Sequence, residues 1–549
     1  MKVLSGILDR CLIATFFLVF LNVCLCQYNA FAQSLPQNFA GLSPYKIGFQ
    51  TKWLQDPARS FTHNADTINR PVLFNMWYPV KRSVTVGSAM HYQDYFDYDR
   101  NSKQLSELSE NYKNYNLSIL AEQFFDKTAP ELSRIDKNVL KNFLNNEARV
   151  YKNAPYADGS FPLIIYHQGF GASVEDNSGL ATYLASNGYV VIGSSFFGET
   201  DQNFGVDGRS ESIRDISFLI DHAKEIPMID TSRIALAGHS GGAQASVLAK
   251  AVLNHRIEAV ISLDTTQDMF GLSDSRWDSY TKPVVENIAN MNSALLAFAD
   301  HRAVFELFNR ASKMDRYYIT TPAFIGHNEF VSQGIYRNYL NYRVLRQNSK
   351  EGSEDAFIEA KFKEWYYNRV NFYILNFLDI HLKKEPEKEH LFREGKYGSE
   401  TDFNELIARR VLIGETGPPP YTYQDKQPPT PDQLWRIAQT DKIKNVVEVL
   451  KKFDMQIGQN PIYDDIFAFA LLYQLVEDDQ IVRAKKLYQY YVEIGAPVTD
   501  RFFSLANFSL LMRRTDYAKN CMHVLLKLDP NNKKASQLLK EFENKPMNN

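Results

Sequence analysis

The sequence predicts an α/β fold with a mostly parallel sheet, followed by a smaller domain built only of helices. From residue 161 onward, short apolar runs alternate with helical stretches, a pattern typical of a parallel sheet with helices on both faces. One of these runs leads into a glycine-rich turn and a helix of small residues. After the proline-rich stretch 414–431, only helical patterns follow. The chain has 549 residues, too many for one ordinary core, so two domains are expected.

The first domain is predicted to span residues 42–413. Its opening runs, 45–49 and 72–79, have the apolar and aromatic content of strands. The strands that follow are expected at 163–166, 190–194, 234–237, 259–263, 294–299 and 317–325. Helices are expected at 211–224 and 243–253, and a long aromatic helix at 361–383 closes the domain. Ligands bind such sheets beyond the carboxyl ends of the strands, so the functional residues are expected there.

A polar, tyrosine-rich segment, about residues 92–150, has a helical pattern and interrupts the order of the strands. Two interpretations stay open for this insertion. It covers the active site, or it is a peripheral pair of helices that does not contact the substrate.

The most specific motif lies in the stretch 233–250, RIALAGHSGGAQASVLAK. A short apolar strand leads into the turn GHSGG and then into a helix. A G-x-S-x-G turn between a strand and a helix holds its serine in a strained conformation with the hydroxyl exposed. Bulkier residues in place of the flanking glycines would clash with the strand and the helix. We therefore predict that Ser240 is a nucleophile, and that His239 contributes its backbone rather than its ring.

A serine nucleophile needs a histidine that accepts its proton and a carboxylate that orients the histidine. In this kind of fold the chain order is serine, acid, histidine. His327 lies just past the last predicted strand, where a loop returns to the sheet beside Ser240. Asp264 ends the strand at 259–263, and Asp300 ends the next strand. Because adjacent strand ends are about 5 Å apart, either carboxylate could reach the histidine.

An oxyanion hole needs two backbone N–H groups that point at the developing negative charge. One is expected from Gly241, the residue after the nucleophile. The other is expected from the glycine-rich loop after the strand at 163–166. In this loop the Phe170 N–H is preferred, with Gln168 as the alternative. The later loop at 195–199 also follows a strand and is a candidate wall of the acyl pocket.

The motifs HQGFGAS, GHSGGA, SLD and IxGHxxF together resemble the α/β hydrolases related to platelet-activating-factor acetylhydrolase and dienelactone hydrolase. The resemblance covers about residues 42–385. In the acetylhydrolase branch the acid follows the strand after the elbow helix, which implies Asp264. In the dienelactone hydrolase branch it follows the next strand, which implies Asp300. We prefer Asp264. The chain departs from these families at Gln168, where the acetylhydrolase pattern has histidine, and at Ser240, where dienelactone hydrolase has cysteine.

The predicted function is that of a serine esterase that cleaves small-molecule or lipid-like carboxylic esters without a cofactor. A peptidase or amidase would use the same residues and is the nearest alternative. A binding protein, in which this fold is only a scaffold, is the alternative from another class. The formal net charge of −3 shows no basic excess and argues against a nucleic-acid partner.

The N-terminus has the pattern of a signal peptide. Two basic residues precede an apolar run at 11–26, and an A-x-A-like site predicts cleavage after Ala32, which removes residues 1–32. The apolar run is short for a membrane span, so an exported protein, periplasmic or secreted and without a stable span, is expected. Three of the four cysteines lie in this segment. The mature chain would keep only Cys521, and no structural metal is predicted.

The C-terminal part begins after the proline-rich linker 414–431, and residues 432–549 are predicted to be helical. Ala484 and Ala518 stand in similar segments 34 residues apart, which is the period of tetratricopeptide repeats. This resemblance implies two or three degenerate repeats that bind a protein partner. An unrelated helical bundle is the alternative.

Overall fold

The structure is a computed structural model, and we describe it for these residues: 43–63, 66–98, 103–125, 127–169, 171–198, 209–264, 287–299, 306–320, 326–348, 353–394, 407–414, 471–473, 475–476, 479–495, 498–511 and 515–544. The predicted signal peptide and residues 415–470, which include most of the predicted linker, lie outside the described residues. In the part that is described, no helix is both long enough and apolar enough to cross a membrane.

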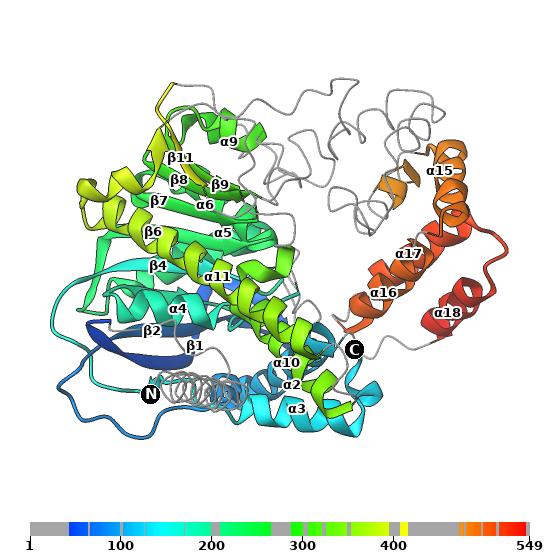
Figure 1. Cartoon of the computed structure of the whole chain (residues 1–549), viewed down its shortest axis with the longest axis horizontal. Helices are drawn as coiled ribbons and strands as arrows, with labels where there is room; N and C mark the ends of the chain where they lie inside the picture. The colour runs from blue at the N-terminus through cyan, green and yellow to red at the C-terminus, as the bar shows by residue number, and fades with distance from the viewer. Residues whose placement is uncertain are drawn as a thin grey trace, which may run out of the picture.

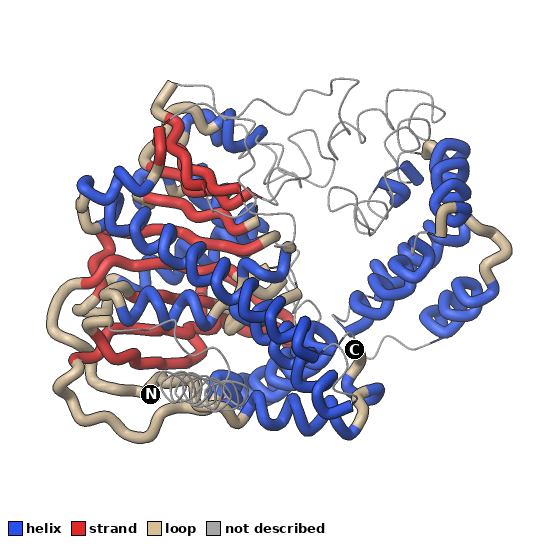
Figure 2. Tube along the Cα trace, in the orientation of Figure 1, coloured by secondary structure: helices blue, strands red, loops and turns tan. Residues whose placement is uncertain are grey.

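The core of the larger domain is an 11-stranded sheet in the order β10-β11-β9-β8-β7-β6-β4-β5-β2-β1-β3, and Figure 2 shows its strands in red. Neighbouring strands from β5 through β4 to β9 are parallel, whereas β1, β2 and β11 add antiparallel pairs. The strands are β1 (Tyr45–His63), β2 (Asp66–Lys81), β3 (Tyr151–Lys152), β4 (Phe161–His167), β5 (Val190–Gly193), β6 (Ile229–His239), β7 (Ala259–Leu263), β8 (Ala294–Ala299), β9 (Asp315–Thr320), β10 (Arg393–Glu394) and β11 (Ile407–Val411).

Both faces of the parallel sheet are buried, because alternate residues of a strand point to opposite sides. In β4, Ile164 belongs to one apolar core and Leu163 and Ile165 belong to the other. Such double burial explains why these strands are continuous apolar runs. The predicted strands 259–263 and 294–299 are confirmed to the residue. β4 and β6 are longer than predicted.

Helices cover the two faces of the sheet. α4 (Ser178–Ser186) and α11 (Ser353–Leu382) pack on one face, where Figure 1 shows them crossing the sheet. α5 (Arg209–Ala223) and α6 (Gly241–Val252) pack on the other face. The remaining helical elements of this region are η4 (Asn254–Arg256), η5 (Asn287–Asn290), α9 (Glu306–Arg310), η6 (His327–Phe330), α10 (Ser332–Asn348) and η7 (Pro386–Leu391). This arrangement confirms the predicted α/β fold.

The first two strands form one long antiparallel hairpin, β1 with β2, rather than the short runs 45–49 and 72–79. The register shifts between Asp56 and Ser60, at a bulge or irregularity. The far half of β1 alternates buried with exposed residues, and its polar positions hid the strand from the apolar pattern. Most of β2 is buried on both faces, as its apolar sequence suggests.

The insertion at 92–150 is part of the main core. It consists of η2 (Tyr92–Phe96), α2 (Lys103–Phe125), η3 (Ala129–Glu131) and α3 (Arg134–Leu144). The Tyr92 ring lies 5.9 Å from the ring of Tyr336 in α10, and Phe143 lies 5.4 Å from the same ring. The insertion is therefore not peripheral to the core, and its predicted role as a cover of the active site stays a prediction. The insertion packs against α10, which follows the segment of His327.

The described C-terminal helices have an apolar core of their own. They are α15 (Ile481–Glu493), α16 (Val498–Leu511), α17 (Thr515–Leu528) and α18 (Lys533–Asn544), drawn in orange to red in Figure 1. Ala484 and Ala518 are each the fourth residue of their helices, and both are fully buried. Small residues at matching positions let neighbouring helices approach closely. Cys521 is also buried in this core.

Candidate active site

Strained backbone marks the carboxyl ends of three parallel strands. Phe196 follows β5 with φ 46°, Ser240 follows β6 with φ 54°, and Asp264 follows β7 with φ 70°. Positive φ is costly for residues other than glycine, and such strain gathers at functional sites. The sheet order places β7, β6, β4 and β5 next to one another. The residues predicted from the sequence therefore meet at one edge of the sheet.

Ser240 occupies a sharp turn between β6 and α6, with φ 54° and ψ −123°. A Cβ on Gly238 would lie 2.2 Å from the Gly242 carbonyl oxygen. A Cβ on Gly242 would lie 2.2 Å from the His167 carbonyl oxygen. Both glycines are therefore required by close backbone approach, and at Gly242 the neighbour is the end of β4 and its loop rather than β6 or α6.

His327 and Asp264 are in direct contact. The Nδ1–H of His327 donates to the Oδ2 of Asp264, whose side chain is 1% exposed. The His327 side chain is 35% exposed, so the ring reaches from the buried carboxylate toward the open end of the site. The Ser240 N–H donates to the Leu263 carbonyl at 3.3 Å, which ties the turn to the end of β7. A histidine oriented by a carboxylate can act as the base of a serine nucleophile, and the neighbour of Ser240, His239, bonds to the His327 backbone at 2.8 Å.

The ring of His239 also takes part in the site, so the expectation that only its backbone matters is wrong. Its Nε2–H donates to the His327 carbonyl oxygen at 2.8 Å, and the two rings lie 4.6 Å apart. Burial, and then the neighbouring His327, lower the pKa of His239 to about 3. The ring therefore stays neutral at physiological pH and holds the backbone of His327.

One candidate ligand atom each of His239, Asp264 and His327 lie within 4.8 Å of one another, which raises the question of a metal. In the hydrogen-bonded arrangement, His327 Nδ1 and His239 Nε2 both carry protons. A ring nitrogen that carries a proton offers no lone pair to a metal ion. In this arrangement His327 Nδ1 and His239 Nε2 act as hydrogen-bond donors, and the lone pair of His327 lies on Nε2, where it can accept a proton.

The loop after β4 lies against the serine. A Cβ on Gly169 would be 2.9 Å from His239 Nδ1 and 3.3 Å from Ser240 Cβ, so only glycine permits this approach. Gly241 is the first residue of α6, where a backbone N–H has no acceptor within the helix. The side chain of Gln168 is buried and donates to the Ser195 carbonyl at 2.9 Å, which links this loop to the one after β5.

A buried arginine supports the loop after β5. Arg70 is 1% exposed and donates to the Phe197 and Gly198 carbonyls at 2.8 and 2.7 Å. Its guanidinium also pairs with Asp215, at 2.6 Å from Nη2 to Oδ2. The rings of Phe196 and His167 stack 3.8 Å apart, and burial lowers the pKa of His167 to about 4. The loop beside the predicted acyl pocket is thus fixed by charge pairing and by stacking.

Two predicted residues cannot be placed. Phe170, the preferred second donor of the oxyanion hole, and Asp300, the alternative acid, lie outside the described residues. Of the two candidate acids, the contact with His327 is shown for Asp264.

Sequence reasoning missed two buried acids, Glu175 and Asp176, which follow the glycine-rich loop after β4. Burial raises the pKa of Glu175 to about 8 and that of Asp176 to about 7. The one available signal was a run of polar residues, SVEDNS, between an apolar strand and the next helix.

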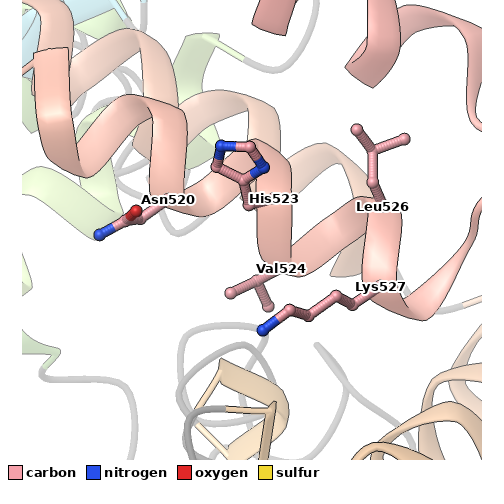
Figure 3. Close-up of a pocket in the computed structure, with 5 residues that line it drawn as sticks. All are labelled: Asn520, His523, Val524, Leu526 and Lys527. Carbon is pink, nitrogen blue, oxygen red and sulfur yellow. The ribbon is translucent and has the colours of Figure 1, made fainter.

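A hollow lies on the C-terminal helix α17, and its lining residues include no nucleophile. Figure 3 shows five side chains of α17 that line a cavity of about 470 Å³: Asn520, His523, Val524, Leu526 and Lys527. They include an imidazole and an ammonium group but no hydroxyl, thiol or carboxylate.

The chain was compared with protein families, curated proteins and solved structures. A family model described as Chlorophyllase matches residues 123–275, which include Ser240 and Asp264 and end before His327. No curated protein matches the chain. Among the solved structures that match is the ferulic acid esterase from Streptomyces cinnamoneus, at 17% sequence identity and a TM-score of 0.41. The match covers 63% of this chain and 92% of that chain.

Proposed function

We propose that this chain is a serine hydrolase that cleaves carboxylic esters through Ser240, His327 and Asp264. The observation that carries the proposal is the strained Ser240 turn next to a histidine whose Nδ1–H is held by a buried carboxylate. The family model named Chlorophyllase covers the serine and the acid, which supports an ester hydrolase. A small-molecule or lipid-like ester is the proposed substrate.

In the proposed mechanism the Ser240 Oγ attacks the acyl carbon while His327 Nε2 takes the hydroxyl proton. The negative charge moves to the carbonyl oxygen, where the Gly241 N–H and a second N–H, which we assign to Phe170, stabilise it. Collapse of this intermediate expels the alkoxide, and His327 returns the proton to it. Water then attacks the acyl-enzyme with the same histidine as base, which releases the acid and regenerates Ser240. Asp264 keeps the histidine in the required tautomer throughout.

Labelling with a fluorophosphonate and hydrolysis of p-nitrophenyl esters test this proposal. Ser240→Ala should abolish labelling and lower kcat by roughly 10⁶-fold, because the triad acts as a unit. Ser246→Ala is the matched control. Ser246 is a buried serine in α6 whose hydroxyl has no hydrogen-bond partner among the described residues, so its loss should leave both readouts unchanged.

The outcomes separate the alternatives. Activity of Ser240→Ala within about tenfold of wild type would show that Ser240 is not the nucleophile. A folded wild-type chain that is not labelled at all would favour a binding protein. Faster turnover of p-nitroanilides than of the matching esters would favour an amidase or peptidase. Esters of graded acyl length would then define the acyl pocket.

We also propose that the protein is exported after removal of residues 1–32, and that residues 432–549 bind a protein partner. The pattern of basic residues, apolar run and A-x-A-like site supports the first point. The separate core of the C-terminal helices, with Ala484 and Ala518 at matching positions, supports repeat-like packing. An intact mass that begins at Gln33 in the periplasmic or extracellular fraction would support export, and an uncleaved chain in the cytoplasm would contradict it.

A further inference from the structure

A short polar segment, residues 173–179, runs from the loop after β4 into the first turn of α4 and is buried. Its side chains are at most 4% exposed at Glu175, Asp176, Asn177 and Ser178. Buried polar groups are costly unless they form hydrogen bonds. The partners of this segment therefore indicate why it is buried.

On one side, Asp176 bonds to the loop that carries the oxyanion hole. Its Oδ2 accepts the backbone N–H of Gly169 at 3.4 Å. Its Oδ1 accepts the hydroxyl of Tyr166, in β4, at 2.9 Å. The carboxylate thus connects the end of β4 with Gly169, the glycine that lies against Ser240.

On the other side, the same residue bonds to the segment that follows His327. The Asp176 carbonyl oxygen accepts the Gln333 N–H at 2.9 Å and the Ser332 hydroxyl at 3.0 Å. Gln333 also donates from its side chain to the Ser173 hydroxyl at 3.0 Å. Ser332 and Gln333 begin α10, directly after η6, whose first residue is His327.

Asn177 strengthens this second connection. Its Oδ1 accepts the Ser332 N–H at 3.2 Å and the Tyr367 hydroxyl at 2.5 Å. Its Nδ2 donates to the Phe330 carbonyl at 3.4 Å. Tyr367 lies in α11, so the start of α10 is held from both the sheet side and the covering helix.

Resting on the proposed function, we propose that Asp176 is a positioning residue that sets the oxyanion-hole loop relative to His327. Its side chain fixes Gly169, and its backbone fixes the start of α10. These two segments must hold the oxyanion donors and the general base at the same acyl carbon. Misplacement by about 1 Å can cost about 100-fold in rate, so one residue bonded to both segments has a direct effect on turnover. Asp176 does not itself touch the substrate.

Kinetics of full-length Asp176→Ala and Asp176→Asn on p-nitrophenyl esters test this role. Asp176→Ala should lower kcat about 10- to 100-fold, with KM and the far-ultraviolet circular dichroism spectrum nearly unchanged. The oxyanion donors and the base lose their alignment, whereas the binding site of the substrate is kept. Asp176→Asn keeps an acceptor oxygen for Gly169 and should stay within about fivefold of wild type.

Asp379→Ala is the matched control. Asp379 is also a buried carboxylate that accepts a tyrosine hydroxyl, from Tyr189 at 2.7 Å, but it lies in α11 and is not bonded to the site. It should lower Tm while kcat stays within about twofold of wild type. Equal kcat values for Asp176→Ala and Asp379→Ala, in folded protein, would overturn the positioning role.

If Asp176→Ala does not fold, Tyr166→Phe is the second test, since it removes the hydroxyl that donates to Asp176 and keeps the aromatic ring. A kcat about three- to tenfold below wild type with unchanged KM would support the role, and a wild-type kcat would overturn it. Failure of the proposed function looks different. A wild-type chain that a fluorophosphonate does not label at Ser240 would overturn both ideas. A labelled wild type with full kcat in the Asp176 variants would overturn only this inference.

Discussion

Replacing Asp264 by asparagine isolates the role of the carboxylate that holds His327. The side chain keeps its size, and asparagine tolerates the positive φ of 70° better than most residues. The fold should therefore survive. Asparagine can offer its N–H₂ group to His327 Nδ1, which favours the tautomer with the proton on Nε2. In that tautomer the histidine cannot accept the Ser240 proton.

We expect Asp264→Asn to lower kcat about 10⁴-fold, as in a protease triad with the same change. At 1.36 kcal/mol for each tenfold, this loss corresponds to about 5 kcal/mol of transition-state stabilisation. The carboxylate is 1% exposed, so water cannot replace it as the partner of Nδ1–H. Stopped-flow and steady-state hydrolysis of p-nitrophenyl acetate, with Tm measured in parallel, would test this.

Asp300→Asn is the matched control, because Asp300 follows the next strand and is the alternative acid from the sequence. It should keep kcat within about twofold of wild type. The reasoning would be refuted if folded Asp264→Asn retained activity within about tenfold of wild type. It would also be refuted if Asp300→Asn, rather than Asp264→Asn, showed the large loss of kcat.

Two further predictions concern pH and domain organisation. Burial raises the pKa of Glu175 from 4.5 to about 8, so the folded state binds a proton that the unfolded state releases. The protonated Glu175 carboxyl stabilises the folded state fully below pH 4.5, and this stabilisation is lost as the pH rises toward 8. The Tm of the wild type should therefore fall more steeply between pH 5 and 9 than the Tm of Glu175→Gln, and the free energy of unfolding should differ by up to a few kcal/mol. Equal slopes of Tm against pH would contradict this prediction. A chain that ends at Gly417 should fold and hydrolyse small esters at near the full-length rate, because few core contacts cross a proline-rich linker. Insoluble protein, or a large loss of kcat/KM, would show that the C-terminal helices help to form the site.

The sequence alone predicted the α/β fold because its central strands are buried on both faces. Double burial leaves continuous apolar runs such as 259–263, which can be read without any tertiary information. The long hairpin of β1 and β2 was underestimated, since the far half of β1 has one exposed face. Helix α10 was not predicted, because its polar and aromatic residues show no clear apolar stripe.

For the site, the sequence determined the residue types and the elbow around Ser240, because this turn is specified locally by glycines at 238 and 242. The choice between two acids could not be made from local pattern. Strand ends that are adjacent in the sheet offer equivalent carboxylates, and only tertiary structure shows Asp264 in contact with His327. The contacts of the His239 ring and of the Asp176 backbone carbonyl could not be predicted either, since each bonds to a segment distant in sequence. Hydrogen bonds between segments some 90 to 160 residues apart leave no local periodicity, so their function is decided by the packing of the folded chain.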